Sequence, residues 1–330
     1  MPTLPESAPS ASPSASPSGP LVSGGVIPPL CTPLTADREL DTASLERLCA
    51  FLLDAGVDGL FVNGSTGELA YHTDEVRLAA LRVVRSVAGG SVPVLAGAVD
   101  MTTNRVVDQA RAARAAGADG VVATVPFYSP THPGEMADHF RAVGHAVDLP
   151  LWAYDIPSNV QRKLPPHVVA ELAAEGVLAG LKDSSGDVEG LRTLLELTEA
   201  NGARGSGFTV LTGSETMADT ALALGADGIV PGLGNVDPHG FLALHRAARR
   251  GDLKEAAAEQ ERLRGLFGMI RVGDPDRIGE YSSAIGAFKE ALHQRGVIAS
   301  SATPVPMRPL SGAERERVAR FLAQAGLGPV

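Results

Sequence analysis

Residues 116–126 read AGADGVVATVP, a junction between an Ala-rich helical pattern and an apolar, β-branched run. The glycine at 117 is a natural left-handed stop for the preceding helix, and the run after it has the composition of a strand. Two further junctions have almost the same form, AGVDG at 55–59 and LGADG at 224–228. This repetition predicts a chain built from consecutive helix–strand units.

The same alternation extends in both directions from this stretch. Strands are predicted at 26–30, 59–62, 92–99, 120–126, 149–155, 178–183, 208–213 and 228–232. Helical patterns lie between them, at 42–55, 73–88, 102–116, 134–147, 165–175, 187–201, 215–224 and 238–250. Eight such units fit a (β/α)8 TIM barrel. A doubly wound open sheet is the alternative, but the first strand–helix turn, LCTPL at 30–34, lacks a glycine-rich phosphate fingerprint.

The two ends of the chain differ from this pattern. Residues 1–20 hold six Pro, six Ser and three Ala, a composition that cannot build a core, so residues 1–24 are expected to form a disordered arm. The barrel is assigned to 25–250. A helical extension is assigned to 251–330, with helices near 252–270, 280–295 and 312–326 and a capping box from Ser311 and Glu314 at the last. We expect it to serve packing or oligomer contacts.

Composition excludes several classes of protein. The chain has 28 Lys and Arg against 38 Asp and Glu, a net charge of −10, which argues against a nucleic-acid partner. It shows neither a secretory signal nor the run of about 18 apolar residues that a membrane helix needs, so a soluble, cytoplasmic protein is expected. The two cysteines, Cys31 and Cys49, have no zinc-ligand spacing and are expected to be buried.

In a barrel, reactive side chains come from the carboxyl ends of strands. Among the four lysines only Lys182 ends a predicted strand, where partial desolvation favours the neutral amine that forms a Schiff base. Tyr154 lies one repeat earlier at an equivalent strand end, so its phenol is expected beside the amine as a proton carrier. The alternatives are a lysine paired with Asp183 and a buried tyrosine without a chemical role.

The loop after the second predicted strand, NGSTGE at 63–68, combines glycines with two hydroxyls. Backbone N–H groups converge in such a turn and form a nest for a carboxylate or phosphate. The alternative is an ordinary glycine turn that caps the next helix.

Together these stretches resemble the pyruvate-dependent class I aldolase family that includes dihydrodipicolinate synthase and N-acetylneuraminate lyase. The resemblance covers the chain from about Gly25 onward. It rests on GSTGE at 64–68, PFY at 126–128, YDIPS at 154–158 and GLKD at 180–183, in the family's order and spacing.

The resemblance implies a role for each matching residue. Lys182 would form the Schiff base with a 2-oxo acid, and Tyr154 would relay protons. Gly64, Ser65 and Thr66 would hold the substrate carboxylate. Tyr128 would be donated across a subunit interface, as part of a homotetramer assembled as a dimer of dimers. No metal and no cofactor is expected.

Departures from the family pattern bear on the substrate. Asn159 stands where dihydrodipicolinate synthases carry an arginine for the second substrate, and an amide cannot replace a bidentate guanidinium; Arg162 is a conceivable substitute. With KDSSGD at 182–187, this favours the 4-hydroxy-2-oxoglutarate and 2-keto-3-deoxy sugar-acid aldolase branches. 4-hydroxy-tetrahydrodipicolinate synthase and N-acetylneuraminate lyase are kept as alternatives. Further substrate-binding candidates are Asn159 itself, Ser184, Glu215, Val230 and Asn235, although Glu215 is equally suited to the N-terminus of the next helix.

Three rival functions are weighed against this one. A metal-dependent barrel needs His and carboxylates at strand ends, and none of the eight histidines ends a predicted strand. A phosphosugar isomerase would use the glycine turns at 213–214 and 232–234 but leaves Lys182 and Tyr154 without a joint task. The third rival is a non-catalytic barrel that binds 2-oxo acids.

Overall fold

The computed structural model of the protein describes residues 21–330, and its central feature is a set of eight parallel strands. In chain order they are β1 (Gly25–Val26), β2 (Leu60–Val62), β3 (Val94–Gly97), β4 (Gly120–Ala123), β5 (Leu151–Asp155), β6 (Gly180–Asp183), β7 (Thr209–Thr212) and β8 (Gly228–Ile229). All are buried and most carry Val, Leu or Ile, as expected for parallel strands covered on both faces.

The strands follow one another around a closed ring. Each pairs in parallel with its successor from β2 to β8, and β8 pairs with β1. The ring closes between β1 and β2, where Phe61 N donates to Pro28 O and Leu30 N donates to Phe61 O. The architecture is therefore the predicted (β/α)8 barrel.

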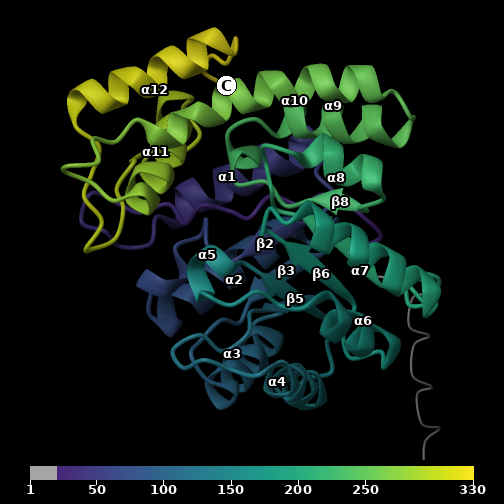
Figure 1. Ribbon diagram of the computed structural model, residues 1–330. Coiled ribbons are helices and arrows are strands. Elements are labelled where there is room, and N and C mark those ends of the chain that lie inside the picture. Colours follow the sequence, from purple (N-terminus) through teal and green to yellow (C-terminus); the bar gives the residue numbers. More distant parts are fainter. Residues whose placement is uncertain (1–20) are drawn as a thin grey trace, which may run out of the picture.

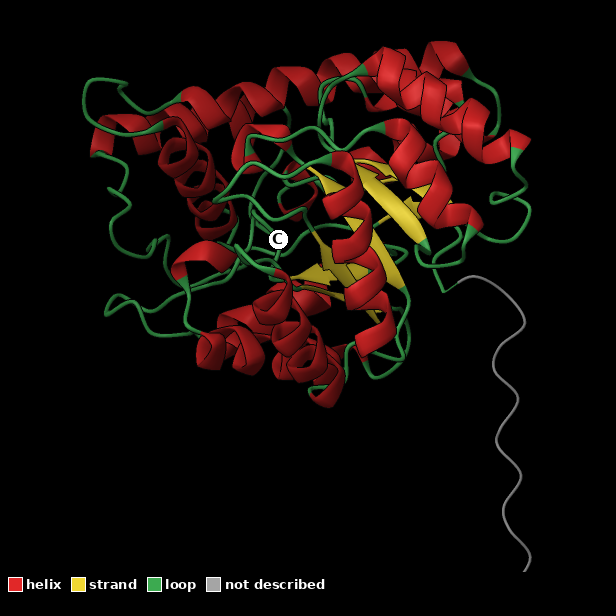
Figure 2. Cartoon of the chain, turned by 60° about the horizontal axis from the view of Figure 1, so that its bottom comes forward, coloured by secondary structure: helices red, strands yellow, loops and turns green. Residues whose placement is uncertain are grey.

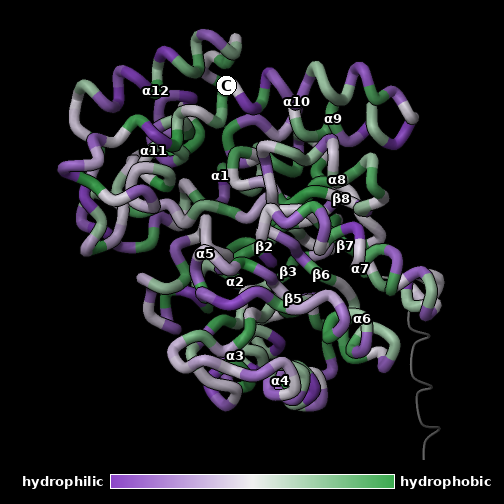
Figure 3. Tube along the Cα trace, in the orientation of Figure 1, coloured by the Kyte–Doolittle hydropathy of each residue, from purple (hydrophilic) through white to green (hydrophobic). Residues whose placement is uncertain are grey.

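Helices surround this ring (Figures 1 and 2). Those of the barrel are α1 (Thr42–Ala55), α2 (Asp74–Ala88), α3 (Thr103–Ala115), α4 (Pro133–Ala146), α5 (Pro157–Val160), α6 (Pro166–Ala174), α7 (Val188–Ala200), α8 (Ala218–Leu224) and α9 (Pro238–Arg249). Hydrophilic and hydrophobic residues alternate along these helices (Figure 3). Each predicted helix is present within three residues of its expected start. The four-residue α5 was not predicted, because one turn has no periodicity to detect.

Each of the three repeated junctions connects a helix to the strand that follows it. Gly56, Gly117 and Gly225 have φ values of 88°, 93° and 111°, the left-handed conformation expected of them. The aspartate two residues later turns back to the preceding strand: Asp58, Asp119 and Asp227 accept from the backbone N–H of Val26, Val94 and Val210. Each junction therefore also pins the amino end of a neighbouring strand.

The C-terminal extension packs over one side of the barrel as α10 (Leu253–Phe267), α11 (Glu280–Gln294) and α12 (Gly312–Gln324) (Figure 1). The predicted capping box is present, and Ser311 N donates to Glu314 Oε2 at 2.6 Å. One hydrophobic cluster joins α11 and α12 to α1, α2 and α9. Most of the predicted N-terminal arm lies outside the described residues, and the described chain already has Val22 buried, before the expected start of the barrel at Gly25. Cys31 and Cys49 are both buried, as predicted.

Candidate active site

Lys182 on β6 and Tyr154 on β5 lie directly opposite each other. The two strands pair so that the Cα of Tyr154 faces the Cα of Lys182, the equivalence expected from one repeat of spacing. Lys182 Nζ lies 3.9 Å from the centroid of the Tyr154 ring and 4.9 Å from that of Phe61. Both side chains are buried, Lys182 with 5% of its surface exposed. An amine held against two aromatic faces is poorly solvated.

The alternative pairing of Lys182 with Asp183 is absent. Asp183 Oδ1 instead accepts from Ser185 N at 2.8 Å, and no carboxylate among residues 21–330 lies within 4.0 Å of Lys182 Nζ. Two other carboxylates have lysine partners of their own: Asp155 pairs with Lys163, and Glu68 pairs with Lys289. The Lys182 amine is therefore available for covalent chemistry.

The loop at 63–68 faces this pair from β2. Ser65 Oγ lies 3.4 Å from Tyr154 Oη, so the hydroxyl and the phenol are within hydrogen-bond reach of each other. The glycines are needed for close approach: a Cβ on Gly64 would lie 2.8 Å from the Phe61 ring, and one on Gly67 would lie 2.9 Å from Leu30 O. The loop is thus a compact turn that brings the Ser65 hydroxyl to the phenol.

Thr66 and Glu215 meet at Gly232, after β8. A Cβ on Gly232 would lie 3.1 Å from Thr66 Oγ1 and 3.2 Å from Glu215 Oε2. Glu215 Oε1 accepts from Leu233 N at 2.6 Å, so its partner is the turn after β8 and not the N-terminus of α8. Burial raises the pKa of Glu215 to about 7, against the opposing effects of the Leu233 and Gly232 amides and the Lys182 charge.

Ser184 and Val230 complete the surroundings of Lys182. A Cβ on Gly213 would lie 2.0 Å from Ser184 Oγ and 3.2 Å from Lys182 Cε. The Ser184 hydroxyl and the Lys182 side chain therefore both pack against Gly213. Val230 and Lys182 both line a cavity of about 10 Å³ inside the barrel, with Leu211 and Phe61. Val230 is therefore an apolar neighbour of the lysine.

The prediction that Asn235 contacts substrate was wrong. Its side chain is completely buried and hydrogen bonded: Oδ1 accepts from Cys31 N, and Nδ2 donates to Pro29 O and Gly232 O. These bonds join the turn after β8 to the segment that follows β1. Asn235 is thus structural, because its amide serves the backbone on both sides of it.

Asn159 and Tyr128 lie farther from the lysine. Asn159 is exposed on α5 and accepts from Ser158 Oγ through Oδ1, at the edge of the site cavity. Tyr128 follows β4 with 82% of its surface exposed. The single chain does not bring Tyr128 to Tyr154, so the predicted donation of this side chain requires a second subunit.

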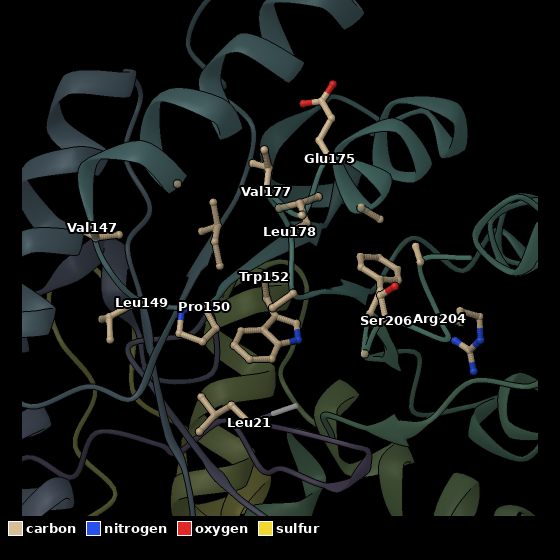
Figure 4. A pocket seen from close by; sticks show the side chains of 18 of the residues that line it. Leu21, Val147, Leu149, Pro150, Trp152, Glu175, Val177, Leu178, Arg204 and Ser206 are labelled. Carbon is tan, nitrogen blue, oxygen red and sulfur yellow. The ribbon is translucent and has the colours of Figure 1, made fainter. Parts of the chain in front are cut away.

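A cavity of about 530 Å³ opens beside Ser65 and Tyr154. Its wall is apolar at Phe127, Ile156 and Val160 and polar at Arg77, Asp100 and Arg105. A larger pocket of about 1080 Å³ lies at the opposite, amino-terminal end of the strands (Figure 4). Two of its charged side chains form ion pairs within the protein: Arg204 with Asp227, and Glu175 with Arg141. The smaller cavity, which Ser65 and Tyr154 line, is therefore the candidate site.

Two side chains at the site were not predicted, and both come from α11. Tyr281 Oη donates to Ser65 O, and Lys289 Nζ lies 2.6 Å from Glu68 Oε2. The sequence offered only one indirect signal, a lysine in the middle of a helical pattern. Its buried partner lies 221 positions away in the chain, beyond any local rule.

A lysine and a tyrosine in register at the strand ends of a (β/α)8 barrel have the placement that Schiff-base chemistry with a neighbouring proton carrier needs. The sequence profile of the Dihydrodipicolinate synthetase family matches residues 22–325. The chain accordingly belongs to that family, whose members are carbon–carbon lyases.

Individual relatives support this assignment. The chain is 33% identical to an uncharacterized DapA-like lyase of Halobacterium salinarum, over 93% of this chain and 96% of that protein. It is 32% identical to the 4-hydroxy-tetrahydrodipicolinate synthase of Moorella thermoacetica, over 92% and 99%. Among solved structures, it resembles YagE, a prophage protein of the family from E. coli K12 in complex with pyruvate, with a TM-score of 0.84, 30% identity and coverage of 92% and 99%.

A second solved structure bears on assembly. A monomeric dihydrodipicolinate synthase variant matches with a TM-score of 0.85 and 27% identity, over 93% of this chain and 99% of that one.

Within residues 21–330, no helix has the length and apolar character needed to cross a membrane.

Proposed function

We propose that the protein is a pyruvate-dependent aldolase that reversibly cleaves a 4-hydroxy-2-oxo acid or a 2-keto-3-deoxy sugar acid. The observation that carries the proposal is the pairing of Lys182 with Tyr154, with the amine 3.9 Å from the phenol ring and Ser65 3.4 Å from the phenol oxygen. The pyruvate bound to the similar protein YagE supports the choice of 2-oxo acid.

In this mechanism the neutral Lys182 amine attacks C2 of the substrate, and the former ketone oxygen takes up protons and leaves as water. The resulting iminium draws the electron pair of the C3–C4 bond as that bond breaks, while the C4 hydroxyl loses its proton and becomes an aldehyde. The enamine is then protonated at C3, and water hydrolyses the imine to release pyruvate. Tyr154 is the proton carrier at each step, and Ser65 extends the path toward the loop.

The loop at 64–68 is the proposed site for the substrate carboxylate. Its hydroxyls at Ser65 and Thr66 lie on the side that faces Tyr154 and Gly232. Fixing the carboxylate there places C2 within reach of Lys182, which converts an encounter into a positioned reaction.

The cavity favours a hydroxylated second substrate. Its wall includes Thr124, whose buried Oγ1 has no hydrogen-bond partner among residues 21–330, and an aldehyde without hydroxyls would leave this oxygen unpaired. Glu215 and Ser184 add two more polar side chains near the lysine. Asn159 at the edge lacks the double donor of an arginine, which weighs against aspartate semialdehyde. The relatives named as 4-hydroxy-tetrahydrodipicolinate synthases make that reaction the second candidate.

Borohydride trapping tests the proposal. Reduction of the imine in the presence of pyruvate should leave one 1-carboxyethyl group on the Lys182 amine, found by intact mass and peptide mapping, and Lys182→Ala should abolish it. Lys254→Ala is the matched control, because this lysine lies on α10 outside the site. A folded wild-type protein that is not labelled by pyruvate or larger 2-oxo acids would contradict the proposal. Glyoxylate, glyceraldehyde and aspartate semialdehyde then distinguish the candidate reactions.

A further inference from the structure

Helix α11 of the C-terminal extension contacts the loop at 64–68 through the Ser65 carbonyl and the Glu68 side chain. Tyr281 Oη donates to the Ser65 carbonyl, and Lys289 Nζ lies 2.6 Å from Glu68 Oε2. The Tyr281 ring also stacks on Tyr71, just after the loop, with centroids 5.8 Å apart and planes 17° from parallel. The extension therefore holds both ends of the loop.

The ion pair between Lys289 and Glu68 is completely enclosed. Both side chains are 0% exposed, and Lys289 Nζ also donates to Ala302 O at 2.9 Å. Removing two charges from water is costly, and a well-packed apolar pair would often be at least as stable. Such a pair is therefore better explained by the geometry that it fixes than by the stability that it adds.

The loop is a segment that needs support from outside. Asn63 and Glu68, at its two ends, have φ values of 57° and 59°, which side chains other than glycine rarely adopt. Within the loop, Gly67 N and Glu68 N donate to the carbonyls of Gly64 and Ser65. From the barrel, Thr32 Oγ1 donates to Gly67 O, and Asn63 Nδ2 donates to Arg77 O. Ser65 Oγ also lies 3.4 Å from Tyr154 Oη. A strained turn persists only where its surroundings over-determine it.

We propose that Tyr281 and Lys289 are positioning residues for the substrate carboxylate. By fixing Ser65 O and Glu68 they hold the loop amides and the Ser65 and Thr66 hydroxyls in place for the carboxylate, and the Lys289 charge compensates a carboxylate buried directly behind that site. The inference rests on the proposed function, because it requires the loop to bind the substrate. It gives the extension a part in binding, beyond the packing role expected from the sequence.

The proposal separates binding from chemistry. Neither α11 contact involves Lys182 or Tyr154, which are held by β6 and β5. Loss of a contact should therefore raise the substrate concentration needed for half-maximal imine formation and leave the maximal labelling of Lys182 intact. Lys289→Met should have the larger effect, because it leaves the buried Glu68 carboxylate with only His72 Nε2, 3.8 Å away, next to an incoming anion.

The test is the concentration dependence of Lys182 labelling with cyanoborohydride, using pyruvate and its uncharged methyl ester. Tyr281→Phe keeps the ring on Tyr71 and removes only the hydroxyl, and we expect a roughly tenfold rise in the half-saturating pyruvate concentration. The curve for methyl pyruvate should not move. Lys289→Met should shift pyruvate further, and the double variant Glu68→Gln/Lys289→Met should recover part of that shift.

The control variant is Arg277→Met, which breaks a different ion pair of the extension, between Arg277, with 32% of its side chain exposed, and the buried Glu314. Wild-type curves for Tyr281→Phe and Lys289→Met would overturn the inference, as would equal shifts for pyruvate and its ester or the same shift in Arg277→Met. If Lys289→Met does not fold, Tyr281→Phe decides alone. Failure of the wild type to label would instead overturn the proposed function, and this inference with it.

Discussion

At the scale of single residues, the site depends on the environment of two side chains, Lys182 and Glu215. Lys182 lies between the rings of Tyr154 and Phe61 with no carboxylate partner among the described residues. Glu215 accepts from the turn after β8 and faces Thr66 across Gly232. Two changes of one functional group each test these environments.

Tyr154→Phe keeps the aromatic face over the amine and removes the proton carrier. We expect kcat for cleavage to fall by roughly 10²–10⁴-fold, the usual contribution of a positioned acid–base group. The variant should remain folded, because the phenol contacts only Ser65 Oγ at 3.4 Å. Steady-state kinetics with circular dichroism checks this, and a kcat within threefold of wild type would assign Tyr154 a packing role.

Glu215→Gln tests the raised pKa through stability. Folding raises the pKa of Glu215 from 4.5 to about 7, mainly by burial, so between these values the folded state binds more protons than the unfolded chain. Its contribution to stability is therefore complete below pH 4.5 and is lost as pH rises through 7. The glutamine variant escapes this loss, and its free energy of unfolding at pH 8 should exceed that of wild type by up to about 3 kcal/mol.

Urea unfolding of both proteins at pH 5 and pH 8 measures this difference. The two proteins should differ much less at pH 5 than at pH 8. An equal difference at both values would mean that Glu215 does not titrate in this range.

At the scale of elements, the repeated glycine–aspartate junctions organise the amino ends of the strands. Asp119 illustrates the arrangement: its Oδ2 accepts from Val94 N at 2.9 Å and from Arg85 Nη1 at 2.9 Å. One carboxylate thus joins α2, the start of β3 and the turn before β4.

Asp119→Ala should destabilise the protein by about 2 kcal/mol, because the Val94 amide is left without its partner. The change lies at the opposite end of the strands from Lys182, so labelling by pyruvate should keep its wild-type concentration dependence. Urea unfolding and borohydride trapping measure the two effects. A change in trapping without a change in stability would contradict this division between the two ends of the barrel.

At the scale of the whole molecule, Tyr128 is the exposed residue that a single chain leaves unexplained. It is 82% exposed on the loop after β4, although its motif resembles one whose tyrosine serves the proton relay. We predict a homotetramer in which Tyr128 completes the site of a neighbouring subunit. The match to a monomeric variant of the family makes this a question for experiment.

Tyr128→Phe should lower kcat by roughly tenfold or more, as expected for part of a proton relay, without changing the oligomer. Sedimentation velocity and kinetics on the same samples provide the test. A monomeric wild type with full activity, or a variant with wild-type kcat, would contradict the prediction.

Much of this protein could be predicted from its sequence, because its decisive signals are local. Left-handed glycines at 56, 117 and 225 stop three of the helices, and apolar runs follow them. The chain alternates strand and helix patterns eight times in all, which is the signature of a barrel. The register of Tyr154 with Lys182 followed from the length of one repeat, since parallel strands in neighbouring units end at similar heights.

Contacts between distant segments were decided only by the tertiary structure. Asn235 is a polar residue after a strand, like Ser184. In the structure, however, its amide is hydrogen bonded to the backbone of Cys31 and Pro29, some 200 positions away. Lys289 and Tyr281 lie in a helical pattern that indicates packing alone, and folding places them behind the loop at 64–68. The periodicity of a sequence reports which face of an element is buried, whereas the partner that meets a buried polar group depends on how all the elements pack.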